Sequence, residues 1–288
     1  MTDAELQRAG NQIRRRALTA VHHAGAGHIG GVFSCADMLA ALYFAELRID
    51  PQQPHWPERD RFILSKGHCA VGLYTALALR GYFDVAELDT FDAIDSRLQG
   101  HPDMTKLPGI DMSTGSLGQG LSPGVGMALG ARILDKGFRT WVMLGDGEVQ
   151  EGQIWEAAFI ASRYNLSNLT AILDWNHLQQ YGWSTSQGYA AVARRDPVDA
   201  PVAKWSAFGW QVFECDGHNV ADFRAACRRA TSVTTGPAII VAHTVKGKGV
   251  SFMQNDYGWH SRPISDAELA QAIAELNAAD DALLENRA

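Results

Sequence analysis

Residues 140–148 read TWVMLGDGE and residues 169–176 read LTAILDWN, and these two stretches decide the fold. In each, an apolar run typical of a buried strand ends near an oxygen-bearing side chain, Asp146 in the first and Asn176 in the second. The sequence between them, from Ile154 to Tyr164, predicts a helix. A right-handed strand–helix–strand crossover brings both side chains to the carboxyl edge of one parallel sheet, where open α/β sheets bind their ligands.

The residue types at this edge suit a magnesium ion that is shared with a diphosphate. Mg²⁺ takes about six oxygens in a tight octahedron and prefers a few protein ligands together with phosphate oxygens. One carboxylate and one neutral amide repel phosphates less than several carboxylates would. Gly145 and Gly147 let the backbone approach an anion closely. Gly-Asp-Gly alone also fits a tight turn with an aspartate cap, but Asn176 at the next strand end favours the metal site.

Length, composition and charge indicate a single large globular domain. The chain has 288 residues, of which 46% are hydrophobic and 20% charged, an ordinary balance for a protein with a substantial core. We expect residues 1–288 to form one domain with a C-terminal helical tail that opens near Ser265. The net charge of −7 gives no general attraction to nucleic acid or to an anionic membrane, so local groups must bind any anionic substrate.

The cysteines and the amino terminus indicate a cytoplasmic protein. Cysteines occur at 35, 69, 215 and 227, a spacing that predicts neither a zinc site nor a disulfide framework. The first twenty residues carry charges without a long apolar core, so they are interpreted as a helix and not as a signal peptide. Because no 18-residue apolar run occurs, we expect no membrane span.

Helix and strand patterns alternate along the chain, which predicts a parallel sheet with helices on both faces. Two stretches, 50–58 and 180–200, are interpreted as long surface loops. The predicted helices are at 4–24, 35–47, 70–81, 119–136, 152–164 and 220–230, and the predicted strands are at 60–65, 139–145, 169–174, 210–215 and 238–243.

An aspartate between glycines, followed about 30 residues later by asparagine, resembles the signature of thiamine diphosphate enzymes. The surrounding sequence resembles the amino-terminal, diphosphate-binding part of transketolases over most of the chain. Each motif alone is weakly specific, but together and in family order they are highly specific. The matching stretches are 27–31 (GHIGG), 65–68 (SKGH), 100–102 (GHP), 114–120 (TGSLGQG), 145–152 and 259–260 (WH).

The resemblance implies thiamine diphosphate and Mg²⁺, or Ca²⁺ or Mn²⁺ in its place, and it implies roles for particular residues. The implied metal ligands are Asp146, Asn176 and the carbonyl of Leu178. The implied catalytic residues are His28 and His101, which face the substrate, and His260, which contacts the diphosphate or the reacting centre. The implied cofactor-binding residues are His68, Gly115, Ser116, Leu117, Gly147, Glu151, Asn176 and His260.

Other polar residues receive a structural interpretation. The remaining histidines at 22, 23, 55, 177, 218 and 243 are not flanked in the same way by glycine or proline motifs, and we interpret them as structural. Asp216 and Asn219 are expected to cap a turn or the following helix. Lys246 and Lys248 lie in a glycine-rich loop and are expected to be solvated. Glu148 occupies a variable position of the family and is assigned no role.

The resemblance also implies a second chain. In transketolases the glutamate that hydrogen-bonds the aminopyrimidine lies in a following domain, and this sequence ends before such a domain begins. We therefore expect the amino-terminal subunit of a split transketolase, completed by a separate carboxy-terminal subunit, with two copies of each chain. The expected reaction transfers a two-carbon ketol unit from a ketose or its phosphate to an aldose or its phosphate.

Two departures from the family and several alternatives stay open. Ile29 stands where many transketolases have proline, and His177 stands where glycine is common, so the metal loop is expected to be altered but tolerated. The alternatives are the α subunit of a 2-oxo acid dehydrogenase, an enzyme like deoxyxylulose-phosphate synthase, or a non-catalytic nucleotide-binding module. The sugar is not defined, and both central pentose-phosphate metabolism and a specialised route for unusual or sulfonated sugars are open.

Overall fold

A computed structural model describes residues 1–180 and 199–285, and these contain one five-stranded parallel sheet. The strand order is β1-β2-β3-β5-β4, and every neighbouring pair is parallel. All five predicted strands are therefore confirmed, to within one or two residues at each end. The strands are β1 (Arg61–Leu64), β2 (Thr140–Gly145), β3 (Leu169–Trp175), β4 (Gln211–Asp216) and β5 (Ala238–His243).

Alternate residues of each strand enter two separate hydrophobic cores, one on each face of the sheet. On β2, Trp141 and Met143 pack into the first core, whereas Val142 and Leu144 pack into the second. The central strands are buried on both sides, which explains why their sequences are continuous apolar runs. The predicted α/β class with helices on both faces is thus confirmed.

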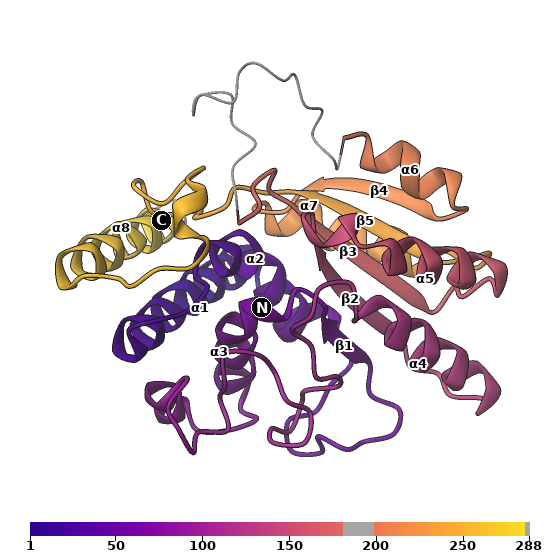
Figure 1. Ribbon diagram of the computed structural model, residues 1–288, viewed down its shortest axis with the longest axis horizontal. Helices are drawn as coiled ribbons and strands as arrows, with labels where there is room; N and C mark the ends of the chain where they lie inside the picture. The colour runs from indigo at the N-terminus through magenta and orange to yellow at the C-terminus, as the bar shows by residue number, and fades with distance from the viewer. Residues whose placement is uncertain (181–198, 286–288) are drawn as a thin grey trace.

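Helices cover the two faces in two groups (Figure 1). The first core is closed by α1 (Asp3–Ala24), α2 (Gly30–Ala41), α3 (Ala70–Arg80) and α7 (Val220–Thr231). The second is closed by α4 (Leu121–Ile133), α5 (Gly152–Arg163) and α6 (Pro201–Ala207). The last helix, α8 (Asp266–Glu285), packs against α1 and not against the sheet.

Helix boundaries follow local capping chemistry. Thr2 and Glu5 form a reciprocal capping box at the start of α1, and Gly25 ends that helix in the left-handed conformation. Ser265 accepts a hydrogen bond from the Glu268 backbone at the predicted start of α8. Asn219 caps α7, as expected. These caps satisfy backbone groups that the helix itself leaves unpaired.

Three differences separate the predicted helices from the observed ones. Helix α2 begins at Gly30 and not near residue 35, because its buried glycines let the backbone pack closely: a Cβ at Gly30 would lie 2.7 Å from the Trp259 carbonyl oxygen. Its last turn widens into a π-helix at Leu42–Glu46. The short helix α6 was not predicted, and the loop predicted at 180–200 lies almost entirely outside the described residues. Among the described residues, no helix is both long and apolar enough to cross a membrane.

Candidate active site

A cavity of about 430 Å³ opens at the carboxyl edge of the sheet. It lies where β1, β2, β3 and β5 end, and each of these strands is followed within three positions by a residue that lines it. The predicted site residues His28, His68, His101, Gly115, Leu117, Asp146, Gly147, Glu151, Asn176, Leu178 and His260 all line this cavity. Ser116 is exposed and is absent from the lining.

Asp146 presents an unpaired carboxylate oxygen at the end of β2. The Gly147 N–H donates to its Oδ1 over 2.7 Å, while its Oδ2 is buried and has no hydrogen-bond partner among the described residues. Burial, followed by the nearby Asp174 carboxylate, raises the pKa of Asp146 to about 7. A buried oxygen without a donor is a position where a cation compensates the lost hydration.

Asn176 and Leu178 are brought to the same place by the next strand end. The Leu178 N–H donates to Asn176 Oδ1 over 3.1 Å, and the Leu178 carbonyl accepts from Lys246 Nζ over 3.1 Å. His177 between them has φ of 63°, in the left-handed region that favours glycine. The donor set of one carboxylate, one amide oxygen and one carbonyl fits the hard-oxygen preference of Mg²⁺ or Ca²⁺.

Four histidines from four separate loops converge above this edge. The ring centroid of His28 lies 5.2 Å from His68, 6.3 Å from His101 and 5.2 Å from His260, and those of His68 and His260 are 5.1 Å apart. Burial, followed by the charge of neighbouring His68, lowers the pKa of His28. Imidazole side chains at these distances can accept or donate a proton at a bound ligand.

Lys246 belongs to the site, and the expectation that it is solvated is wrong. Only 2% of its surface is exposed, and its Nζ contacts His260 Nδ1 at 2.9 Å as well as the carbonyls of Leu178 and Gln179. Burial lowers the pKa of Lys246 to about 8, and the Asp146 carboxylate opposes that shift. Burial and the Lys246 charge together lower the pKa of His260 to about 3. Lys246 is thus a cation at the cavity wall beside a neutral imidazole.

A buried ion pair lies at the wall of the cavity, which Lys66 lines. Lys66 Nζ bonds the Asp174 carboxylate and the Gly31 carbonyl, and Asp174 also accepts from Ser34 and Thr244. Burial alone would lower the pKa of Lys66. The attraction of the Asp174 carboxylate outweighs burial and raises that pKa well above its usual range. The sequence reasoning gave neither residue a role, although Lys66 lies two residues after the end of β1, much as Asp146 comes just after β2.

Glu148 also has a definite place in the structure. It is buried and accepts hydrogen bonds from Ser65 Oγ and from the Gly118 and Gly145 backbones. Burial raises its pKa, and these three donors oppose that effect. Glu148 therefore ties the loops after β1 and β2 to the loop before α4, a structural role that sequence reasoning missed.

Glycines keep the cavity open beside the predicted cofactor loops. A Cβ at Gly115 would lie 3.0 Å from the His101 ring, and a Cβ at Gly147 would lie 3.0 Å from the Gln179 side chain. Glu151 is exposed at the cavity rim, where it N-caps α5 without a side-chain hydrogen bond to that helix. The open rim leaves room for a large ligand.

Comparison with known proteins gives consistent relatives. Residues 6–282 match the family described as transketolase, thiamine diphosphate binding domain. The 6-deoxy-6-sulfo-D-fructose transketolase subunit SqwG of Clostridium sp. (strain MSTE9) is 42% identical over 94% of this chain and 96% of its own. An apulose-4-phosphate transketolase subunit of Phocaeicola vulgatus is 40% identical over 95% of this chain and 93% of its own. Human transketolase is 38% identical, but the match spans only 42% of its length.

Solved structures agree with this relation. Transketolase from Pichia stipitis in complex with sedoheptulose-7-phosphate superimposes with a TM-score of 0.85 and 31% identity, over 99% of this chain and 45% of that one. Transketolase from Campylobacter jejuni superimposes with a TM-score of 0.83 and 26% identity, over 99% of this chain and 48% of that one. The chain therefore belongs to the transketolase family and corresponds to the family's thiamine diphosphate-binding domain.

Proposed function

We propose that this chain is the amino-terminal subunit of a two-chain transketolase that depends on thiamine diphosphate and Mg²⁺. The observation that carries the proposal is the unpaired, buried oxygen of Asp146 at the floor of a cavity surrounded by four histidines. The near-complete coverage of two relatives that are named as transketolase subunits supports the division into two chains.

The residues present fit a metal-bound diphosphate. Asp146, Asn176 and the Leu178 carbonyl would hold the metal ion, and His68, His260 and Lys246 would contact the diphosphate. Gly115 and Leu117 would lie against the rings, because the missing side chain at Gly115 leaves that space open. When bound, thiamine diphosphate supplies the nucleophilic carbon that carries the two-carbon unit.

The histidines would handle protons at the sugar hydroxyls. His260 is held neutral, with its Nδ1 accepting from Lys246, so its Nε2–H remains a donor. His28 has a lowered pKa and lies beside His260 and His101, so it can take a proton from a substrate hydroxyl near neutral pH.

An exposed apolar face near the C-terminal ends of α4 and α5, away from the cavity, supports a protein partner. Helices α4 and α5 lie side by side on the outer face of the second core (Figure 1). Their outward side chains include Ile133, Leu134, Phe159, Ile160 and Tyr164, with Ile133 74% exposed. A cluster of this kind is typical of protein–protein interfaces. We assign this face to the assembly in which a separate chain contributes the pyrimidine-side glutamate, with two copies of each chain.

The names of the relatives suggest a ketose with an anionic terminal group. One relative is named for a sulfonated deoxyfructose and two for apulose 4-phosphate. We therefore propose a sulfonated or phosphorylated ketose as donor and an aldose as acceptor, in a specialised sugar route.

Reconstitution tests the proposal. The purified chain is assayed alone and together with the product of the neighbouring gene, using a panel of phosphorylated and sulfonated ketoses with an aldose acceptor. We expect ketol transfer only with both chains, Mg²⁺ and thiamine diphosphate, and none when Asp146→Asn replaces the wild type. Ketol transfer by the single chain would overturn the two-chain assignment, and decarboxylation of a 2-oxo acid by the pair would overturn the reaction.

A further inference from the structure

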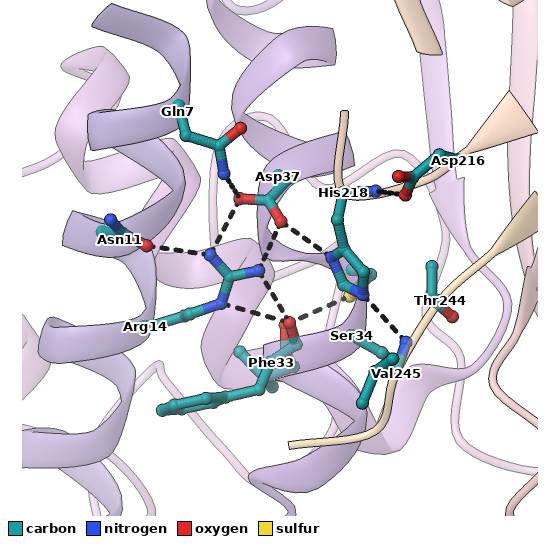
Figure 2. Close-up of polar contacts among 12 residues, drawn as sticks. Gln7, Asn11, Arg14, Phe33, Ser34, Asp37, Asp216, His218, Thr244 and Val245 are labelled. Carbon is teal, nitrogen blue, oxygen red and sulfur yellow. Dashed lines mark hydrogen bonds and ion pairs between the residues drawn. The ribbon is translucent and has the colours of Figure 1, made fainter. Parts of the chain in front are cut away.

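Behind the wall that carries Lys246 lies a buried polar cluster that the proposed chemistry does not use. Figure 2 shows its centre, Asp37 on α2, between Arg14 of α1 and His218 of the loop that follows β4. Asp37 Oδ2 lies 2.9 Å from His218 Nδ1, and its Oδ1 lies 2.8 Å from an Arg14 guanidinium nitrogen. The side chains are 0%, 8% and 1% exposed for Asp37, His218 and Arg14, respectively.

The other nitrogen of the His218 ring accepts a backbone hydrogen bond. The Val245 N–H donates to His218 Nε2 over 2.8 Å. A ring nitrogen that accepts carries no proton, so the ring proton must be on Nδ1, where it is donated to Asp37. The two bonds together define one neutral tautomer, and Asp37 selects it.

Val245 needs such an acceptor because it lies just beyond the sheet. Strand β5 ends at His243, and the Thr244 N–H makes the last contact with β3, at the Trp175 carbonyl. The Val245 N–H has no strand partner, and a half-buried N–H that is left without an acceptor destabilises the fold. His218 supplies the missing acceptor from a different loop, which approaches closely because residue 217 is glycine.

The next residue, Lys246, is fixed on its other side by the backbone. The Asn255 N–H donates to the Lys246 carbonyl over 3.0 Å, and the Gly247 N–H donates to the Gly30 carbonyl over 3.1 Å. On the amino side, the Val245 carbonyl accepts from the Lys248 N–H over 3.2 Å, and the Val245 N–H donates to His218. Of these four bonds, the one to His218 is the bond that a side chain provides. The Lys246 side chain has direct partners in His260 and in the Leu178 and Gln179 carbonyls, and the His218 bond restrains the backbone from which that side chain starts.

We propose that His218 is a positioning residue that aims Lys246 at the anionic part of the ligand, an inference that rests on the proposed function. Asp37, held by Arg14, fixes the tautomer, His218 fixes the Val245 amide, and the amide fixes the start of the Lys246 loop. Sequence analysis interpreted His218 as structural, and the burial of the cluster agrees with that. The proposal adds that His218 also affects the affinity for the ligand.

Two substitutions of similar shape test whether His218 positions Lys246 or only fills space in the buried cluster. His218→Gln places an amide oxygen near the Nε2 position and keeps the acceptor for Val245, whereas His218→Asn places an amide nitrogen near the Nδ1 position and keeps only the bond to Asp37. In the two-chain protein with Mg²⁺, we expect His218→Asn to weaken thiamine diphosphate binding about tenfold or more and His218→Gln to change it by less than about threefold. Binding is measured by isothermal titration calorimetry, and unfolding temperatures are recorded for both variants.

A Lys246→Met background provides the control. If His218 acts through Lys246, then His218→Asn should add no further loss of affinity in that background. Equal affinities of both His218 variants, or an equal loss in the presence and absence of Lys246, would overturn the proposal. If His218→Asn does not fold, the His218→Gln variant alone tests the inference. A loss of thiamine diphosphate affinity in His218→Gln as large as the loss in Lys246→Met would then contradict the inference. A wild-type pair that binds no thiamine diphosphate would contradict the proposed function instead.

Discussion

The Nζ atom of Lys246 lies 2.9 Å from Nδ1 of His260, so a lysine ammonium donates to a neutral imidazole at the wall of the cavity. The contact fixes the tautomer of His260, because Nδ1 must accept and the proton must therefore be on Nε2. It also makes protonation of the ring costly, since a second positive charge would face the first. Burial is the larger cause of the low pKa of His260, and Lys246 is the next.

Removal of Lys246 should therefore raise the pKa of His260. In Lys246→Met we expect that pKa to move from about 3 toward its ordinary value without reaching it, because burial persists. The wild-type protein should lose stability as the pH falls below about 6.5, since only the unfolded state then protonates this ring. Histidine NMR titration measures the pKa. Lys248→Met removes a charge from the same loop and should leave it unchanged; an equal shift in that variant would contradict the assignment.

Substitution of Asp146 should separate folding from metal binding. Its buried carboxylate has a pKa raised to about 7, so the charged form destabilises the metal-free chain. Asp146→Asn should increase the free energy of unfolding by on the order of 2–4 kcal/mol above neutral pH, and the gain should shrink as the pH falls toward about 4. Urea denaturation measures this difference.

The same variant should lose its response to ligand. With the partner chain present, Mg²⁺ and thiamine diphosphate should raise the unfolding temperature of the wild type but not that of Asp146→Asn, because only the wild type binds the metal. Glu156→Gln removes a carboxylate from the exposed side of α5 and should behave like the wild type in both measurements. A retained ligand shift in Asp146→Asn would contradict the metal assignment.

The strands and the metal loop could be predicted from sequence because local patterns determine them. The apolar runs before Asp146 and Asn176 are buried on both sides of the sheet, and a parallel crossover leaves one arrangement for their ends. The convergence of His28, His68, His101 and His260 followed from family resemblance, since no local pattern joins four distant loops. The distances between their ring centroids show how closely these four side chains lie.

The two buried lysines could not be predicted in this way. A lysine in a glycine-rich loop is normally solvated, but Lys246 is buried against the Leu178 carbonyl, 68 positions away, and His260, 14 positions away. Lys66 likewise depends on Asp174, which lies 108 positions away. Burial of a charge is decided by such partners, so it depends on the tertiary structure and not on the surrounding sequence.

The Lys66–Asp174 pair provides a stability prediction. Because both side chains are almost completely buried, Lys66→Met leaves the Asp174 carboxylate without its cation and should cost about 3–5 kcal/mol of unfolding free energy. The exposed pair of Lys136 and Glu58 is the matched control, and Lys136→Met should cost no more than about 1 kcal/mol. Chemical denaturation measures both values. Similar losses of unfolding free energy in the two variants would contradict the prediction, because they would show that water solvates the unpaired Asp174 carboxylate.

His177 provides the last prediction, because two effects of similar size act on it. Its left-handed backbone costs about 1–2 kcal/mol relative to glycine. Its ring lies 4.4 Å from that of Trp175, a contact that returns about 0.5–1.5 kcal/mol. Since these nearly cancel, His177→Gly should change the unfolding free energy by less than about 1 kcal/mol and keep Mg²⁺ affinity within about threefold.

His177→Val tests the backbone contribution directly. A β-branched residue is strained at this positive φ and also loses the ring contact, so it should both destabilise the chain and displace Asn176 and Leu178 from the metal. We expect Mg²⁺ affinity, measured by titration with thiamine diphosphate and the partner chain present, to fall about tenfold or more. Asn165→Val, at a similar positive φ on the surface, should be destabilised without losing affinity. If His177→Val bound Mg²⁺ as tightly as the wild type, the loop conformation would not control the metal site.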